Sequence, residues 1–237
     1  MTDTPQNPYV SKQIELKIGV ITFVILDKNL QTLLSQRSHG PFRDAWAIPE
    51  QKIELNEDLH ETALRELSGK VSDPEARIQL EQLGAYGSPE RDPRGRTVTV
   101  AFWTVIPNFE KFTDVNGLLD VQPIKVSDIE NGSLKMAFDH NEIFADAIEN
   151  LRSKMESTSV AANFFDSPFT LSEFRNVYEA AWETKINAGN FQRKIQQTEN
   201  FLIPTGEKAP PDSSGGRPAD LFLKGLEKKL DPPLKRK

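Results

Sequence analysis

Residues 46–72 decide how this chain folds, and they read WAIPEQKIELNEDLHETALRELSGKVS. Within this stretch, residues 57–67 combine charged side chains with apolar ones that recur every three or four positions: Leu59, Ala63, Leu64 and Leu67. That spacing places the apolar residues on one side of a helix and the charged residues on the other. The stretch therefore predicts an amphipathic helix, which ends early at Gly69.

Segments before and after this helix have the composition of strands. Ile14–Leu26 is rich in β-branched residues, and a short turn leads from it into a second apolar segment at residues 33–34. This pattern predicts a β-hairpin. Leu80–Tyr86 and Thr97–Ile106 predict a second hairpin, and the segment between them, Ser88–Arg96, gives that hairpin a polar and basic tip.

A further helix is expected after Asp139. It carries apolar residues on one side: Ile143, Phe144, Ala147, Ile148 and Leu151. Asp139 stands where a helix cap is expected, because a short acidic side chain can accept hydrogen bonds from the first free backbone N–H groups. Residues 153–168 lose the periodicity, so we expect a domain boundary there.

Residues 168–237 predict a second domain. Thr170–Glu173 matches a capping box and precedes a helix with an apolar side formed by Phe174, Val177, Tyr178, Ala181 and Trp182. A shorter helix over residues 187–197 follows, and then two strands at residues 201–203 and 219–223 flank a segment rich in Pro and Gly. Two helices followed by a hairpin with a long tip are the pattern of a winged helix.

The chain is thus expected to have four parts. They are a flexible arm at residues 1–12, a first domain at 13–155, a linker at 156–167 and a winged-helix domain at 168–237. The Leu- and Lys-rich end of the last domain, residues 224–237, is expected to fray.

The composition excludes several classes of protein. The 37% hydrophobic content is enough for a core. The longest apolar run, Ile18–Leu26, is only about half as long as a membrane-spanning helix, and no charged and then apolar leader precedes it, so we expect a soluble, cytoplasmic protein. With no cysteine and three scattered histidines, neither a disulfide framework nor a zinc site is expected, and we expect no metal and no cofactor.

The net charge of −6 is unevenly divided along the chain. Residues 168–237 contain 12 basic and 9 acidic residues, whereas the preceding part contains 17 and 26. A basic C-terminal domain on an acidic body suggests a protein that faces nucleic acid, although a basic surface is more often simply solvated.

Residues 46–53 and the helix after them resemble the Nudix box, G-x5-E-x7-R-E-U-x-E-E-x-G-U, in which U is aliphatic. Four residues match the box: Glu57, Arg65, Glu66 and Leu67. Others depart from it: Gln51 and Ser72 stand in place of glycines, and Gly69 and Lys70 stand in place of the paired glutamates.

The loss of these glutamates bears on catalysis, because magnesium needs clustered oxygen ligands and must offset the charge that develops on a diphosphate. A lysine such as Lys70, ~4 Å from a divalent ion, would repel it by roughly 8 kcal/mol at an effective dielectric near 20, an upper limit since the side chain can turn away. Gly69 also interrupts the helix, which costs about 1 kcal/mol relative to alanine. We therefore expect no enzyme. The alternative is a pyrophosphatase that works through Glu57, Glu61 and Glu66.

The resemblance also implies a nucleotide site. Nudix-like domains that handle ADP-ribose carry arginine and aromatic side chains around this pocket, and arginine suits a diphosphate because its planar fork offers several charged donors. The residues assigned to the ligand are Arg37, Phe42, Trp46, Glu66, Arg91, Arg94 and Arg96. Taken singly, each is more often an ordinary surface or core residue. Ala137–His140 also resembles a segment of these regulators; a helix cap at Asp139 and a packing role for His140 are favoured over ligand contact.

The C-terminal part resembles the winged-helix domain of the NrtR family of Nudix-related transcriptional regulators. The resemblance rests on three segments in order: Asn190–Ile195, Pro204–Glu207 and Gly216–Ala219. On the second helix, Phe191 and Ile195 are four residues apart and should pack inward. The residues assigned to base reading are Asn190, Gln192, Arg193 and Gln197, and those assigned to the DNA backbone are Lys194, Lys208 and Arg217. The alternative is a solvated helix face.

Together the two resemblances cover nearly the whole chain and imply an α+β protein, a Nudix-like mixed sheet/helix sandwich followed by a winged helix-turn-helix domain. They imply a homodimeric repressor of NAD-metabolism genes that binds a palindromic operator and that ADP-ribose or a related nucleotide releases from DNA. Some members of the group sense sugar-related signals instead. Two other functions stay open: the pyrophosphatase with an accessory C-terminal domain, and an interaction adaptor that has lost both activities.

Overall fold

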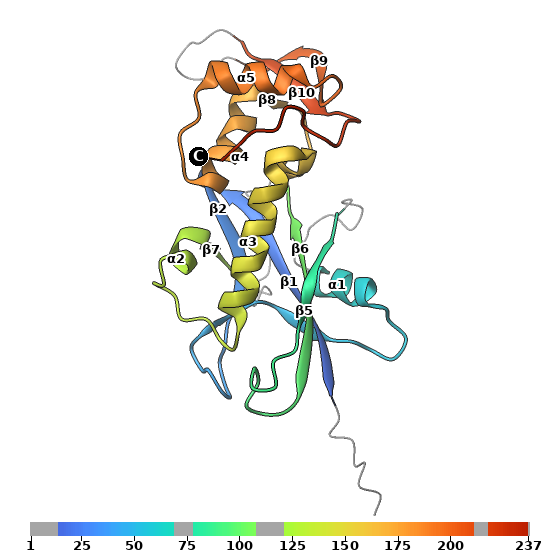
Figure 1. Ribbon diagram of the computed structural model, residues 1–237, viewed down its shortest axis with the longest axis vertical. Helices are drawn as coiled ribbons and strands as arrows, with labels where there is room; N and C mark the ends of the chain where they lie inside the picture. Colours follow the sequence, from blue (N-terminus) through green and yellow to red (C-terminus); the bar gives the residue numbers. More distant parts are fainter. Residues whose placement is uncertain (1–13, 69–77, 108–120, 211–217, 237) are drawn as a thin grey trace, which may run out of the picture.

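The structure is a computed structural model, which describes residues 14–68, 78–107, 121–210 and 218–236 (Figure 1). Its lower part is a seven-stranded mixed sheet, and its upper part is a small domain of helices and a three-stranded sheet. None of the helices in the described ranges combines the length and the apolar character needed to span a bilayer.

The mixed sheet is built around strand β1. It consists of β1 (Glu15–Leu26), β2 (Asn29–Gln36), β3 (Trp46–Ala47), β4 (Glu50–Lys52), β5 (Glu81–Tyr86), β6 (Thr97–Val105) and β7 (Gln122–Lys125). β1 and β2 form the predicted hairpin, whose turn residues Asp27 and Lys28 both have a positive φ, as tight hairpin turns require. β5 and β6 form the second predicted hairpin, and β6 runs parallel to β1. Both sequence-based hairpins are therefore confirmed.

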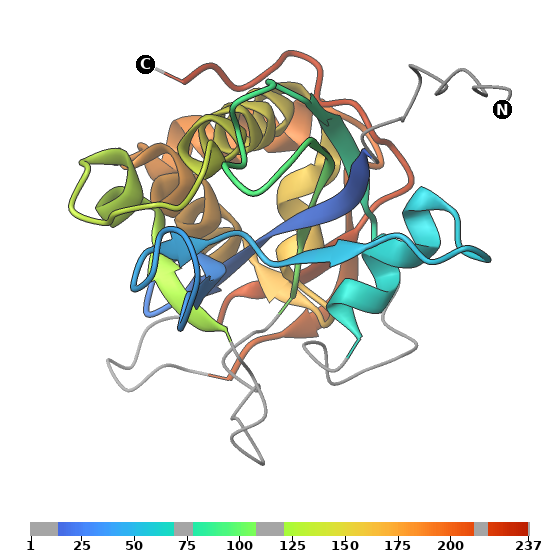
Figure 2. The same cartoon turned by 90° about the horizontal axis from the view of Figure 1, so that it is seen from below.

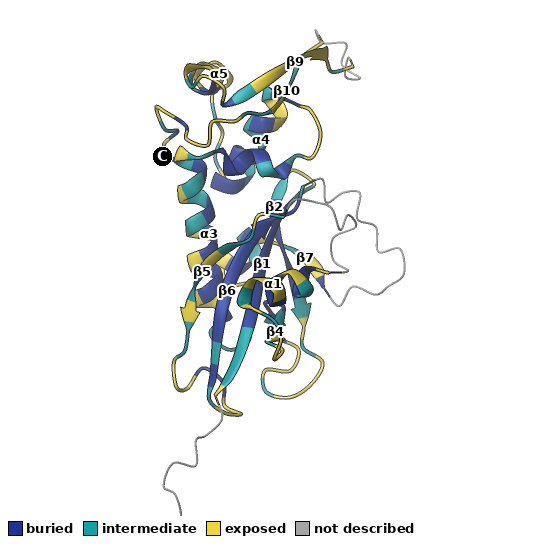
Figure 3. Cartoon of the chain, turned by 90° about the vertical axis from the view of Figure 1, so that its right-hand side faces the viewer, coloured by how far each residue is buried: buried dark blue, intermediate teal, exposed yellow. Residues whose placement is uncertain are grey.

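Helices cover both faces of this sheet. Side chains of β1 alternate between the two faces: Ile18 and Val20 pack in one apolar cluster with α1 (Leu59–Leu67), and Phe23 packs on the other face with α3 (His140–Ser157). Figure 3 shows the resulting buried layer along β1 and β6. A short helix, α2 (Val126–Glu130), follows β7. The predicted mixed sheet/helix sandwich is confirmed.

The upper domain has the predicted winged-helix order. It contains α4 (Leu171–Trp182), α5 (Ala188–Gln197), β9 (Leu202–Lys208) and β10 (Asp220–Lys224), and a short strand, β8 (Phe169–Thr170), extends the wing sheet. The predicted capping box is present, since the Glu173 amide donates to Thr170 Oγ1 at 3.1 Å and the Thr170 amide donates to Glu173 Oε2 at 2.7 Å. The arm at residues 1–12 lies outside the described residues.

The chain between the two domains is more ordered than its sequence predicts. Helix α3 continues to Ser157, and a 3₁₀ helix, η2 (Ser159–Phe164), follows it within the segment that we predicted as a linker. Most residues of η2 are buried, because its small and apolar side chains fit between the domains. Residues of both domains therefore belong to one continuous apolar cluster.

The prediction that residues 224–237 fray is wrong for the described residues 224–236. Leu230 and Leu234 retain only 2% and 7% of their exposure and join the main core. The sequence does not reveal this burial, because two leucines separated by Asp231, Pro232 and Pro233 do not establish a periodic apolar pattern.

Candidate ligand site and nucleic-acid interface

Three loops meet at the lower end of the sheet, around the first turn of α3 (Figures 1 and 2). They are the loop after β2 (residues 37–45), the loop between β5 and β6 (residues 87–96) and the connection before α3 (residues 131–139). The winged helix lies at the opposite end of α3. An 18-residue helix is about 27 Å long, so this length separates the loops from the upper domain.

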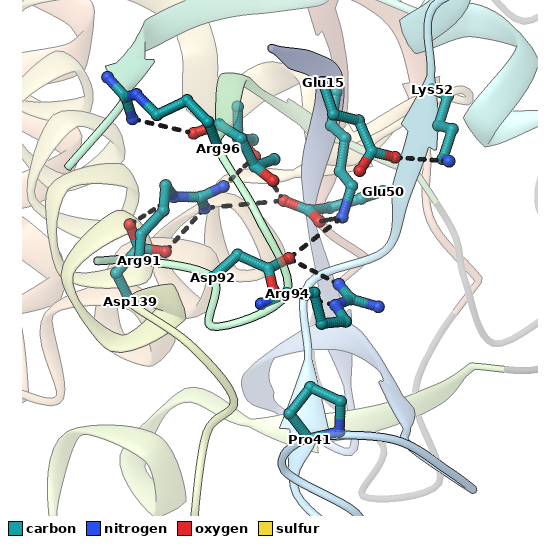
Figure 4. A network of polar contacts seen from close by, with 12 residues as sticks. Glu15, Pro41, Glu50, Lys52, Arg91, Asp92, Arg94, Arg96 and Asp139 are labelled. Atoms are coloured by element: carbon teal, nitrogen blue, oxygen red, sulfur yellow. Dashed lines mark hydrogen bonds and ion pairs between the residues drawn. The ribbon is translucent and has the colours of Figure 1, made fainter. Parts of the chain in front are cut away.

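Arg91 and Asp139 join the β5–β6 loop to the start of α3 (Figure 4). The Arg91 guanidinium donates through Nε and Nη2 to the two carboxylate oxygens of Asp139, each at 2.7 Å. Asp139 occupies the N-cap position, but its side chain forms no capping hydrogen bond, so the prediction of a side-chain cap is wrong. The reason is competition, because a bidentate pair with a buried guanidinium is stronger than a bond to a backbone N–H.

Glu50, to which the sequence reasoning assigned no role, lies at the centre of the polar network. Its carboxylate accepts a hydrogen bond from Thr99 at 2.8 Å, and it lies 3.6 Å from Lys17 and 3.9 Å from Arg91. His140 Nε2 lies 3.5 Å from Glu50 Oε1. Burial raises the pKa of Glu50, but the hydrogen bond and charge of His140, together with Lys17 and Thr99, outweigh it and lower the pKa to about 2.

His140 is held in place by the backbone. Its Nδ1 accepts a hydrogen bond from the Ile48 amide at 3.0 Å, so Nε2 is the nitrogen that faces Glu50. The ring is 99% buried and lies 5.3 Å from the Phe138 ring. The packing role favoured for His140 agrees with these contacts, which also place it in the network.

Arg94 is compensated by its own neighbour. Its guanidinium donates to both oxygens of Asp92, at 2.9 and 2.6 Å, and this hydrogen bonding lowers the pKa of Asp92 to about 2. Lys17 also lies 3.9 Å from Asp92. We call the six charged residues together the ion-pair cluster: Lys17, Glu50, Arg91, Asp92, Arg94 and Asp139. Its three cations and three anions balance.

Arg37 and Arg96 differ from the arginines of the ion-pair cluster. Arg37 donates to the carbonyls of Pro41 at 3.0 Å and His39 at 3.4 Å, and Arg96 donates to the carbonyl of Gly87 at 2.6 Å. Within the described ranges, neither guanidinium forms an ion pair with a carboxylate. Both arginines therefore keep a positive charge that no carboxylate of the described residues neutralises.

An aromatic surface adjoins Arg37 and Arg94. The rings of Phe42 and Phe138 are 4.8 Å apart, and the guanidinium carbons of Arg37 and Arg94 lie 4.8 and 5.4 Å from the centre of the Phe138 ring. Phe42 is exposed, whereas Trp46 packs against the main core. Phe138 carried no assigned role in the sequence, although its neighbours Asp139 and His140 did.

The residues of the Nudix box are engaged in other ways. Arg65 donates to both oxygens of Glu57, at 2.6 and 2.8 Å, and Thr62 donates to the same carboxylate. Glu61 accepts from the Asp58 amide as part of a capping box. Glu66 is buried on α1, and Gly69, Lys70 and Ser72 lie outside the described residues.

Glu57 and Glu61 are both engaged by partners within the protein. Both oxygens of Glu57 already accept from Arg65, and the Glu61 side chain caps its own helix. Across residues 14–68, 78–107, 121–210 and 218–236, no three acidic, histidine or cysteine side chains are grouped closely enough to hold a metal ion. Of the carboxylates proposed for the pyrophosphatase alternative, Glu57 is bound by Arg65 and Glu61 by the Asp58 amide.

The second helix of the upper domain exposes several polar side chains. Phe191 and Ile195 of α5 are buried, as their spacing predicts. The residues assigned to base reading are all exposed: Asn190, Gln192, Arg193 and Gln197. Arg193 donates to Asn190 Oδ1 at 3.2 Å, which is a local contact on the exposed face.

Of the described residues assigned to the DNA backbone, Lys194 is partly buried and Lys208 is exposed. Lys194 Nζ donates to the Pro233 carbonyl at 2.8 Å, so its ammonium points to the C-terminal segment. Lys208 forms an exposed ion pair with Asp220 at 2.7 Å. Arg217 lies outside the described residues.

Comparisons with known proteins agree with this architecture. A family model described as "NUDIX domain" matches residues 15–147, and one described as "NrtR DNA-binding winged helix domain" matches residues 161–223. The "ADPR responsive transcriptional repressor NtrR" of Acinetobacter baylyi is 30% identical over 223 residues, which cover 90% of this chain and 82% of that protein.

Two further relatives divide between regulation and hydrolysis. The crystal structure of Shewanella oneidensis NrtR complexed with a 27mer DNA has a TM-score of 0.75 and 29% identity, and it covers 90% of this chain and 98% of its own. The "ADP-ribose pyrophosphatase" of Methanocaldococcus jannaschii is 32% identical over 124 residues, which cover 52% of this chain and 68% of that protein. The similarity to the hydrolase thus covers about half of the chain, whereas the similarity to the regulators covers both domains.

Proposed function

The chain belongs to the NrtR family of Nudix-related transcriptional regulators, and on that premise we propose that it is a DNA-binding repressor that ADP-ribose releases from its operator. One observation carries this proposal. The similarity to a relative named as an ADP-ribose-responsive repressor extends over 90% of the chain and includes both the sensing and the DNA-binding domain.

Arg37 and Arg96 are the best candidates for holding the diphosphate of the ligand. Their guanidinium groups donate to neutral carbonyls, so a phosphate would gain an uncompensated charge without displacing a carboxylate. Phe42 and Phe138 offer an apolar face beside Arg37 on which a nucleobase could stack. Arg94 contributes an ion pair beside this surface and Trp46 packs against the core, whereas Glu66 lies on α1 and stays a predicted ligand residue.

The Arg91–Asp139 pair gives the ligand a means to act on α3. It joins a loop that borders the nucleotide surface to the first turn of the helix whose far end meets the winged helix. A ligand can release DNA only if it binds one arrangement of the domains more tightly than the other. We infer that contacts of the ligand with these loops favour an arrangement in which α5 no longer fits the groove.

DNA recognition is assigned to the exposed face of α5. Amide side chains can pair with adenine and arginine with guanine, which suits Asn190, Gln192, Arg193 and Gln197. The family further suggests a homodimer on a palindromic operator that controls genes of NAD metabolism, because a two-fold protein requires two half-sites.

We further propose that the chain does not hydrolyse ADP-ribose. The support is chemical: Gly69 and Lys70 replace two carboxylates of the Nudix box, and Glu57 and Glu61 are held by other partners. Incubation of the protein with ADP-ribose and Mg²⁺ or Mn²⁺, followed by chromatography of the nucleotides, tests this statement. Turnover at the rate of a pyrophosphatase would show that catalysis survives.

The decisive experiment measures the affinity of the protein for the DNA upstream of its own gene, with and without ADP-ribose. We expect nanomolar to submicromolar binding that falls steeply as salt rises, and weaker binding when the nucleotide is present. AMP at the same concentration is the control for an effect of nucleotide charge alone. If ADP-ribose leaves the affinity unchanged, the sensor function is wrong; if no duplex binds in a salt-dependent way, the adaptor alternative gains.

A further inference from the structure

The last described residues of the chain connect α5 of the winged helix to α3. We call residues 225–236 the C-terminal strap. In Figure 1 this dark red segment leaves the wing, passes the upper end of α3 and ends beside α4. It lies outside the ranges that both family models match, which end at residues 147 and 223.

One side of the strap binds the end of α5. Thr198, the residue that ends α5, donates from Oγ1 to the Asp231 carbonyl at 2.7 Å and accepts from the Asp231 amide at 2.9 Å. Lys194 adds the hydrogen bond to the Pro233 carbonyl at 2.8 Å. The strap therefore holds the last turn of α5 through a reciprocal pair of hydrogen bonds and a charged donor.

The other side of the strap binds the end of α3. The Leu230 amide donates to the Ser157 carbonyl at 2.8 Å, and the Ser159 amide donates to the Lys228 carbonyl at 2.9 Å. Arg236 forms an ion pair with Glu149 of α3 at 2.6 Å. These contacts fix the strap to the helix whose first turn lies at the candidate ligand site.

At its start, the strap passes very close to the backbone of the turn after α5. A Cβ atom placed on Gly225 would lie 1.8 Å from the Asn200 carbonyl oxygen, which no side chain can tolerate, so glycine is required where the strap passes the turn after α5. Leu230 and Leu234 then anchor the segment in the core. A tail without a function would need neither feature.

Apolar packing alone fixes the position of α5 less specifically than the hydrogen bonds to the strap do. Phe191 lies 5.8 Å from Phe174 and 5.4 Å from Tyr178 between ring centres, and such apolar contacts tolerate small shifts because they are not directional. The hydrogen bonds of Thr198 and Lys194 are directional, and their acceptors belong to a segment that is fixed to α3. A displacement of the upper end of α3 therefore moves the acceptors that hold α5.

We propose that the C-terminal strap transmits the position of α3 to α5, and that Lys194 and Thr198 are positioning residues that hold α5 to the strap rather than contacts to DNA. The part of this proposal that concerns ADP-ribose rests on the proposed function. The part that concerns Lys194 does not depend on any effector, because it is decided by DNA binding alone.

The first test measures how the affinity for the duplex from upstream of the gene depends on salt concentration. It compares Lys194→Met with Arg193→Met, which changes the exposed neighbour of Lys194. A lost phosphate contact lowers the slope of log affinity against log salt by about one, whereas a lost positioning contact leaves the slope unchanged. We expect Lys194→Met to weaken binding about 3- to 10-fold at an unchanged slope. A fall of the slope by about one for Lys194→Met, or an unchanged affinity, would overturn the positioning role.

The second test is the coupling factor, which is the ratio of the DNA dissociation constants with and without saturating ADP-ribose. Thr198→Val removes both hydrogen bonds to Asp231 while keeping the shape of the side chain. Thr205→Val is the matched control, since Thr205 also forms two hydrogen bonds in this domain but none with the strap. We expect Thr198→Val to lower the coupling factor at least about 3-fold, while calorimetry finds ADP-ribose affinity unchanged and Thr205→Val keeps the coupling of the wild type.

The outcomes separate the two proposals. If the wild type responds to ADP-ribose and Thr198→Val responds equally, the strap proposal fails and the sensor function stands. If the wild type does not respond at all, the sensor function fails, and the slope measured for Lys194→Met still decides whether the strap positions α5. Truncation after Gly225 serves as a stronger variant where circular dichroism shows that the shortened chain folds; normal coupling in such a chain would also overturn the proposal.

Discussion

The two ends of the molecule use charge in opposite ways. At the lower end, the cations of the ion-pair cluster are matched by carboxylates, Arg91 by Asp139 of another segment and Arg94 by Asp92 of its own loop, and Arg91 and Asp92 are buried. At the upper end, Arg193 and the amide side chains of α5 are exposed, and Arg193 donates a hydrogen bond to Asn190 on the same helix.

This difference separates structure from recognition. A buried ion pair fixes the relative position of two segments, and breaking it leaves a charge without a partner in a low dielectric. Exposed side chains do not hold one segment of the protein against another, and their hydrogen-bond donors remain available to a partner such as DNA. The lower end should therefore respond to substitution mainly through stability, except at Arg37 and Arg96, and the upper end mainly through binding.

The largest expected effect is the loss of stability in Arg91→Ala. The Asp139 carboxylate would lose both of its strong donors, and we expect the free energy of unfolding to fall by about 3–5 kcal/mol. Urea unfolding followed by circular dichroism measures this. In the double variant Arg91→Ala/Asp139→Ala the loss should be smaller than the sum of the single losses; strict additivity would show that the pair is not coupled.

Glu50 provides the next largest effect, in the response to acid. The pKa of Glu50 is about 2 in the folded protein against an ordinary value of 4.5. Its contribution to the free energy of unfolding is therefore present above pH 4.5 and is lost as pH falls towards 2. This difference corresponds to on the order of 3 kcal/mol. We expect Glu50→Gln to be less stable than the wild type at pH 7, and the gap between them to narrow between pH 4.5 and 2. A constant difference in stability between Glu50→Gln and the wild type across this pH range would contradict the lowered pKa of Glu50.

The sequence predicts elements best where the signal is local. The helix over residues 57–67, the two hairpins and the capping box at Thr170 were found because spacing and turn chemistry are encoded within a few residues. The strap was missed because Leu230 and Leu234 are buried by contacts with segments distant in the chain, and isolated leucines among charged residues and prolines do not reveal such contacts.

The same distinction applies to the candidate sites. Phe191 and Ile195 pack inward as predicted, because their spacing alone determines the buried side of α5. Asp139 was assigned a capping role because its local position allows one, whereas its partner Arg91 is 48 residues away. Glu50 was missed for the same reason, since Thr99 and His140 define its role and neither is near in sequence.

Arg37 and Arg94 sharpen the comparison within the lower end itself. Arg37 has no carboxylate partner in the described ranges and Arg94 is paired with Asp92, although both guanidinium groups lie near the Phe138 ring. We expect Arg37→Ala to weaken ADP-ribose binding by roughly 1.5–3 kcal/mol, and Arg94→Ala to weaken it less, because only Arg37 carries an uncompensated charge. Isothermal titration measures both. An equal loss would show that the ligand displaces Asp92 from Arg94.

At the upper end, Arg193→Ala should affect one function and leave the other. We expect operator affinity to fall by about 1–3 kcal/mol, because an exposed guanidinium that reads a base edge is lost, while ADP-ribose affinity stays nearly unchanged. Fluorescence anisotropy and calorimetry provide the two values. A parallel loss of both would indicate misfolding, and thermal unfolding of the same variant identifies that case.

The smallest effect is expected at Lys208, and it bears directly on the division between the two ends. Its ion pair with Asp220 is exposed on both sides, and such pairs contribute about 0–1 kcal/mol to stability. Lys208→Ala should therefore leave the unfolding midpoint nearly unchanged, although an ion pair is lost as it is in Arg91→Ala. If Lys208 contacts a phosphate, the same variant lowers the salt slope of DNA binding by about one. A marked loss of stability with an unchanged salt slope of DNA binding would mean that the ion pair of Lys208 is structural. Charge in the wing would then serve stability, as it does at the lower end, rather than binding.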